Sequence, residues 1–106
     1  MKKLFLFSIL SIFIIGCTSS SKLMQRGMYD YAINNAVKKL KKKPTKYKEI
    51  EVLKESYRLA NQLNTDRIDF LRKTGEPTIW DEVYVNYNAM KNRQTTVSTL
   101  PQSVLN

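Results

Sequence analysis

Apolar residues recur at intervals of three and four along most of the chain, which is the spacing of helices that bury one face. This pattern predicts a helix over 29–43, a second over 46–61, a short third over 66–74 and a fourth that begins after Pro77. No alternation typical of strands competes with these assignments. We therefore expect an all-α protein with about four helices.

Residues that start or stop helices stand close to the predicted boundaries. Pro44 follows the first helix and Gly75 follows the third, as expected at helix ends. Asn64 and Thr65 are candidate caps for the third helix. The faces expected to be buried are Tyr29, Ala32, Ile33, Ala36, Val37 and Leu40 in the first helix, Tyr47, Ile50, Leu53, Tyr57 and Ala60 in the second, and Trp80, Val83, Tyr84, Tyr87 and Met90 in the fourth.

The first residues have a different pattern. Lys2 and Lys3 precede a mostly apolar run over 4–15. A membrane-spanning helix needs about 20 apolar residues, whereas the core of a signal peptide needs roughly 7–15. The length of the run therefore favours a signal peptide over a transmembrane anchor.

Ile14, Ile15, Gly16 and Cys17 resemble the lipobox of bacterial lipoproteins, in which branched apolar residues and a small residue precede a cysteine. The resemblance implies cleavage after Gly16, a diacylglycerol thioether on Cys17 and an acyl chain such as palmitate on its new amine. Three acyl chains make an effectively permanent anchor. The residue after Cys17 is Thr18 rather than an aspartate, which favours the outer membrane. No acidic cluster follows the cysteine, which favours the periplasmic face over the cell surface.

Gly27, Tyr29, Ala32 and Pro44 resemble the second half of a tetratricopeptide repeat. In such repeats the glycine permits a tight turn, the alanine lets two helices approach closely, and the proline ends the helix. The sequence departs from that pattern at Lys39, where the family has a small residue. A generic pair of amphipathic helices is the alternative interpretation.

The organisation that follows is a signal peptide over 1–16, a lipidated cysteine and flexible tether over 17–26, a degenerate tetratricopeptide-like helical domain over 27–94 and an irregular tail over 95–106. In this arrangement the chain is similar to the start of longer lipoproteins of the Bacteroidota. That likeness implies a location and an architecture, but no activity.

Charge is concentrated in one short stretch. The 106 residues carry a formal net charge of +9, and residues 38–48 contain seven lysines and no acid. Cations suit the end of a helix, so a solvated helix end is the simplest interpretation. Contact with anionic lipid headgroups ranks second and nucleic acid a distant third. The residues for such an anionic-surface contact are Lys38, Lys39, Lys41, Lys42, Lys43, Lys46 and Lys48.

Composition argues against catalysis. The chain has no histidine, one cysteine and three glycines. It therefore lacks the commonest general base and metal ligand, and it has few of the glycines that a phosphate-binding loop needs. Glu51 and Glu55 share a helix face, but Lys54 and Arg58 stand three residues after them, as in ordinary surface ion pairs. We expect no enzyme, no cofactor and no metal site.

The favoured hypothesis is a lipid-anchored envelope protein whose helices form a protein–protein interaction or structural module. Tyr31 and Trp80 stand near turns and are candidates for a partner groove. The expected partners are the membrane, through the lipid, and another envelope protein, with no nucleic acid and no small-molecule substrate. The alternative is a small basic lipoprotein that binds anionic lipid or wall polymer through residues 38–48.

Overall fold

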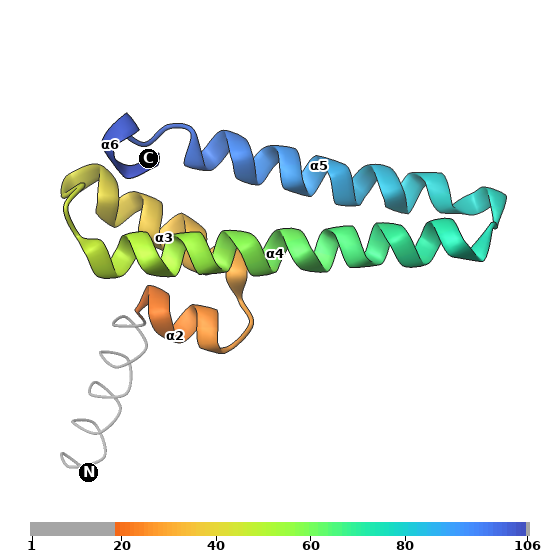
Figure 1. Ribbon diagram of the computed structural model, residues 1–106, viewed down its shortest axis with the longest axis horizontal. Coiled ribbons are helices and arrows are strands. Elements are labelled where there is room, and N and C mark those ends of the chain that lie inside the picture. The colour runs from red at the N-terminus through yellow and green to blue at the C-terminus, as the bar shows by residue number, and fades with distance from the viewer. Residues whose placement is uncertain (1–18, 106) are drawn as a thin grey trace, which may run out of the picture.

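The computed structural model describes residues 19–105, and every regular element among them is a helix, which confirms the all-α prediction (Figure 1). The predicted signal peptide and Cys17 lie outside the described residues. The elements are α2 (Ser20–Gln25), α3 (Tyr29–Lys42), α4 (Tyr47–Thr74), a 3-10 turn η1 (Pro77–Ile79), α5 (Trp80–Val97) and α6 (Gln102–Leu105).

The chain is already ordered in α2, so the prediction of a flexible tether over 17–26 is wrong from Ser20 onward. The side chain of Ser19 caps α2 by accepting a hydrogen bond from the backbone N–H of Lys22 at 3.2 Å. Ser20 is fully buried, and its Oγ accepts a hydrogen bond of 3.0 Å from Asn35 of α3. Gly27 then turns the chain with φ of 78°, a conformation that suits glycine.

Helix α3 matches the sequence prediction closely. It ends at Lys42, just before Pro44, and its apolar stripe faces the interior. The fully or almost fully buried residues of this stripe are Ala32, Ile33, Ala36, Val37 and Leu40.

Helix α4 is one uninterrupted helix of 28 residues, so the predicted break before residue 66 is wrong. The two residues predicted to cap the third helix make other contacts. Thr65 donates a hydrogen bond back to the carbonyl of Gln62 at 3.1 Å, and Asn64 contacts α5. The helix ends at Gly75, as predicted, and the φ of 68° at this residue is a left-handed conformation that suits glycine. Its length is about 42 Å at 1.5 Å per residue.

Helix α5 returns along α4, and the chain after it is not the irregular tail predicted over 95–106. Helix α5 continues to Val97 and α6 follows. Leu100 and Val104 are buried and belong to the main hydrophobic cluster. The C-terminal residues therefore close the core formed by α3 and α4.

The core consists of two clusters along the α4–α5 hairpin. The main cluster lies where α3, α4 and the C-terminal residues meet, at one end of α4 (Figure 1). The second cluster contains Ile68, Leu71, Ile79 and Val83 and lies near the turn that joins α4 to α5. Because α3 is half as long as α4, it covers only the first half of the hairpin (Figure 1).

Candidate functional site

A lysine-rich surface surrounds the turn between α3 and α4, and we call it the lysine end. All of its lysines except Lys39 are exposed. Lys39 is partly buried, and its Nζ lies 3.4 Å from Oε1 of Glu49. The lysine end consists of Lys38, Lys39, Lys41, Lys42, Lys43, Lys46 and Lys48. The structure thus gathers every lysine predicted for an anionic-surface contact at one end of the molecule.

The described chain begins beside this lysine end. Ser19, Ser21 and Met24 line one wall of a hollow whose other wall is the start of α4. Lys48 and Glu51 belong to that second wall. The first described residue and the lysine-rich turn therefore lie at the same end of α4.

The second surface is a row of aromatic residues on α5, which we call the aromatic face. Trp80, Tyr84 and Tyr87 follow one another at helical spacing, and they are 62%, 68% and 51% exposed. The prediction that these residues form the buried stripe of the helix is wrong. The buried side of the helix contains Val83, Met90 packs against the same cluster, and the aromatic row lies roughly a quarter-turn to a third of a turn away from that side.

Tyr31 and Trp80, the residues predicted to line a partner groove, are both exposed but do not meet. Tyr31 is 65% exposed and stands next to Asp30, which contacts Arg93 of α5. Trp80 precedes Arg93 by 13 residues of helix, which is roughly 20 Å. The two aromatic side chains cannot line one narrow groove.

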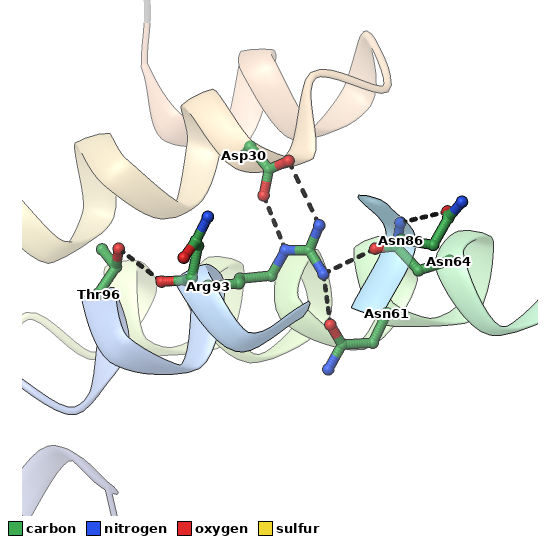
Figure 2. Close-up of polar contacts among 7 residues, drawn as sticks. Asp30, Asn61, Asn64, Asn86, Arg93 and Thr96 are labelled. Atoms are coloured by element: carbon green, nitrogen blue, oxygen red, sulfur yellow. Dashed lines mark hydrogen bonds and ion pairs between the residues drawn. The ribbon is translucent and has the colours of Figure 1, made fainter. Parts of the chain in front are cut away.

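A group of polar residues around the buried Arg93 lies between the two hydrophobic clusters, where α3, α4 and α5 meet, and we call it the polar belt (Figure 2). The side chain of Arg93 is 4% exposed and donates hydrogen bonds to Asp30 of α3 at 2.7 and 3.3 Å. Arg93 also donates to the side-chain oxygens of Asn61 and Asn64 of α4. Asn64 in turn donates to Asn86 of α5 at 2.9 Å. The polar belt therefore ties three helices together.

Sequence reasoning missed Arg93, although a signal was present. Ile79, Val83, Met90 and Val97 recur at spacings of four and seven, and Arg93 falls on the same helix face. An arginine within such a stripe needs an acidic or amide partner, because a buried charge is costly when unpaired. Four of the five N–H donors of the guanidinium are bonded to groups of this chain, so we interpret the polar belt as a structural feature.

Exposed ion pairs account for the remaining charged contacts of α4. Arg58 contacts Glu55 at 2.6 Å, as predicted, and this hydrogen bond holds the pKa of Glu55 below its ordinary value. Arg67 contacts Glu82 of α5 at 2.6 Å and lowers the pKa of that carboxyl in the same way. Within residues 19–105 no salt bridge joins Glu51 to Lys54, so that predicted pair is wrong.

Neither a metal centre nor a membrane span is found in the described part of the chain. Its acidic residues form no group able to hold a metal ion. None of its helices is both long and apolar enough to cross a membrane. Comparison with protein-family models, curated proteins and solved structures gave no match.

Proposed function

We propose that this chain is a lipid-anchored protein of the cell envelope, without enzymatic activity, whose helices form a protein–protein interaction or structural module. The lipobox-like residues that end at Cys17 support the anchor, and the predicted place is the periplasmic face of the outer membrane. The exposed aromatic residues of α5 support the proposed interaction role of the helices.

The observation that carries the interaction role is the aromatic face of α5. A two-helix layer leaves Trp80, Tyr84 and Tyr87 exposed together along about two turns of helix. Aromatic side chains are enriched among the residues that contribute most to protein–protein binding, because they bury a large area with few rotatable bonds. This row is therefore the part of the molecule best suited to contact another envelope protein.

We also propose that α2 and α3 form a tetratricopeptide-like hairpin. The positive φ of Gly27 and the complete burial of Ala32 support this assignment, since the repeat needs a tight turn and a close helix contact. The resemblance does not extend into α4, because an uninterrupted helix of 28 residues replaces the two helices of a second repeat.

Replacement of the cysteine tests the anchor. In the Cys17→Ser variant we expect an unprocessed precursor without lipid, because a serine hydroxyl cannot form the thioether. Mass spectrometry of the membrane fraction measures both properties. If the variant is still cleaved after Gly16 and still partitions with membranes, the lipoprotein assignment is wrong.

Site-specific cross-linking tests the interaction role. A photoreactive phenylalanine analogue at Tyr87 should give a discrete cross-linked product in intact cells. Asn92 is the matched control, because it is also exposed and helical geometry turns it about 140° away from Tyr87. Equal products from both positions, or none from Trp80, Tyr84 and Tyr87 in turn, would count against the aromatic face.

A second candidate function is binding of anionic lipid or wall polymer through the lysine end. The observation that supports this candidate is the position of the seven lysines around one turn. Salt separates the two functions, since a polybasic contact is screened at high ionic strength and an aromatic contact is not.

A further inference from the structure

We propose that the lysine end rests on the anionic headgroups of the leaflet that holds the lipid anchor, so that the α4–α5 hairpin projects away from the membrane. This inference rests on the proposed function, because it requires acylation of Cys17. It adds the orientation of the whole module, and it selects anionic headgroups rather than wall polymer as the partner of the lysine end.

The entry point of the chain supports this orientation. Cys17 precedes Ser19 by two residues, and two residues span at most about 7 Å. Ser19 lines the hollow beside the start of α4, together with Lys48. Ser20 is tied to α3 through Asn35. An anchor at Cys17 therefore holds the lysine end, and not the far end of the hairpin, next to the bilayer.

The charges of the two ends support the same orientation. The lysine end carries seven lysines, of which only Lys39 contacts an acid within the described residues. Residues 69–82, at the opposite end, contain two basic and four acidic residues. An anionic surface therefore attracts the first end and repels the second. Each basic residue close to such a surface favours binding by about fivefold.

Tethering makes the bilayer a better partner than a soluble polyanion of the same charge. A short linker keeps the lysine end at a high effective concentration near the headgroups, of the order of millimolar. Helix α4 then spans about 42 Å between the membrane-proximal turn and Gly75. The aromatic face is left free for a partner in the surrounding compartment.

The test uses the single tryptophan of the chain as a reporter. The processed protein is purified from membranes, and its acylation is confirmed by mass spectrometry. It is then reconstituted in phosphatidylglycerol or phosphatidylcholine vesicles that contain a headgroup spin-labelled lipid. Trp80 reports on the far end. The double variant Tyr47→Trp/Trp80→Phe moves the reporter to the first residue of α4. Tyr47 is exposed there, so the prediction that it belongs to the buried face of the helix is wrong.

In phosphatidylglycerol vesicles we expect strong quenching of the tryptophan at position 47 and little quenching at position 80. Lys41→Gln, Lys42→Gln and Lys43→Gln together should shift the docked equilibrium by roughly a hundredfold and relieve the quenching. Arg72→Gln, Lys73→Gln and Lys91→Gln form the matched control, because they remove three exposed charges elsewhere and should leave the quenching unchanged. High salt should act like the lysine variant.

Three outcomes would overturn the inference. Acylated protein with equal quenching at positions 47 and 80 has no preferred orientation, although the anchor then stands. Quenching at position 47 that survives the triple lysine variant does not depend on charge. If soluble polyphosphate, at a charge concentration equal to that of the lipid, relieves the quenching at position 47, the partner of the lysine end is a free polyanion. Protein without acyl chains would instead refute the anchor itself.

Discussion

Arg93 is the residue on which the contacts among the three long helices converge. Its guanidinium is almost fully buried, whereas the carboxylate of Asp30 is 64% exposed and remains in contact with water. The two partners therefore differ in what happens when one is removed. A guanidinium without its counter-ion is a buried charge, but a carboxylate without its arginine is still solvated.

This asymmetry predicts unequal costs for two substitutions. Asp30→Asn should lower the free energy of unfolding by about 3 kcal/mol, because it leaves Arg93 buried without a counter-ion. Arg93→Met should cost only about 1 kcal/mol, because methionine fills the same space and Asp30 can hydrate. Urea unfolding of both variants measures the difference, and a larger cost for Arg93→Met would contradict the argument.

A second comparison concerns the exposed tryptophan. Trp80→Ala should change the free energy of unfolding by less than about 1 kcal/mol, because most of the indole is already in water. Leu40→Ala, at a fully buried site, should cost about 2–5 kcal/mol. Thermal unfolding of the two variants provides the measurement, and similar losses would show that the indole is buried in solution.

The residue pattern could predict α3 but not the orientation of α5, for a physical reason. In α3 only one face is apolar, so periodicity identifies the buried side. In α5 the row of Trp80, Tyr84 and Tyr87 has the same helical spacing as the row that contains Val83 and Met90. Spacing alone cannot separate two such rows, so the predicted stripe contains both of them, whereas only Val83 and Met90 face the second cluster.

At the scale of elements, the end of α4 could be predicted from the sequence, whereas its continuity could not. Gly75 could be predicted to end α4 because a left-handed residue needs glycine. The continuity of α4 through Asn64 and Thr65 could not be predicted. Such residues can cap a helix, but they can also lie inside one with their side chains hydrogen-bonded or in water. The contact of Asn64 depends on Asn86 of α5, which lies 22 residues further along the chain.

Substitution at Gly75 tests the role of its backbone conformation. Gly75→Ala should cost about 1–2 kcal/mol, because a Cβ is disfavoured at a φ of 68° even though no neighbour lies within 4 Å of its place. Gly75→Asn is the matched control and should cost less, since asparagine tolerates the left-handed region. Urea unfolding distinguishes the two variants, and equal costs would point to an effect other than backbone strain.

The C-terminal residues allow a direct test of the corrected tail. Leu100→Ala should destabilise the protein by about 2–5 kcal/mol, because Leu100 is buried in the main cluster. Leu105→Ala is a suitable comparison, since that side chain is more exposed and should matter less. Thermal unfolding of both variants is sufficient. A negligible effect at Leu100 would restore the prediction of an irregular tail.

At the scale of the whole molecule, stability is expected to vary along the hairpin. The half next to α3 shares the main cluster, whereas the half next to Gly75 contains only four buried apolar residues. The lysine end could be predicted from the sequence because its members are contiguous. The opposite half is uncovered because α4 is twice as long as α3. This could not be predicted, because the sequence pattern divides α4 into two shorter helices.

Hydrogen exchange should show this difference directly. Amide protons of Ile68 and Val83 should exchange faster than those of Ala36 and Leu53, because opening the far half exposes less apolar surface. Exchange measured by NMR at several pH values gives the local free energies of opening. Uniform protection along α4 would indicate a single cooperative unit.

The polar belt also determines how α5 is aligned along α4. Apolar side chains tolerate a slide of one helical turn, but such a slide would separate Arg93 from Asp30 and place Asn86 beside apolar neighbours. The polar belt therefore fixes a single alignment of α5 along α4. A variant in which Asp30, Asn61, Asn64 and Arg93 are all replaced by apolar residues of similar size should be at least as stable, yet it should allow more than one alignment. Engineered cysteine pairs that report each alignment would then cross-link in more than one combination, whereas the native chain would form a single pair.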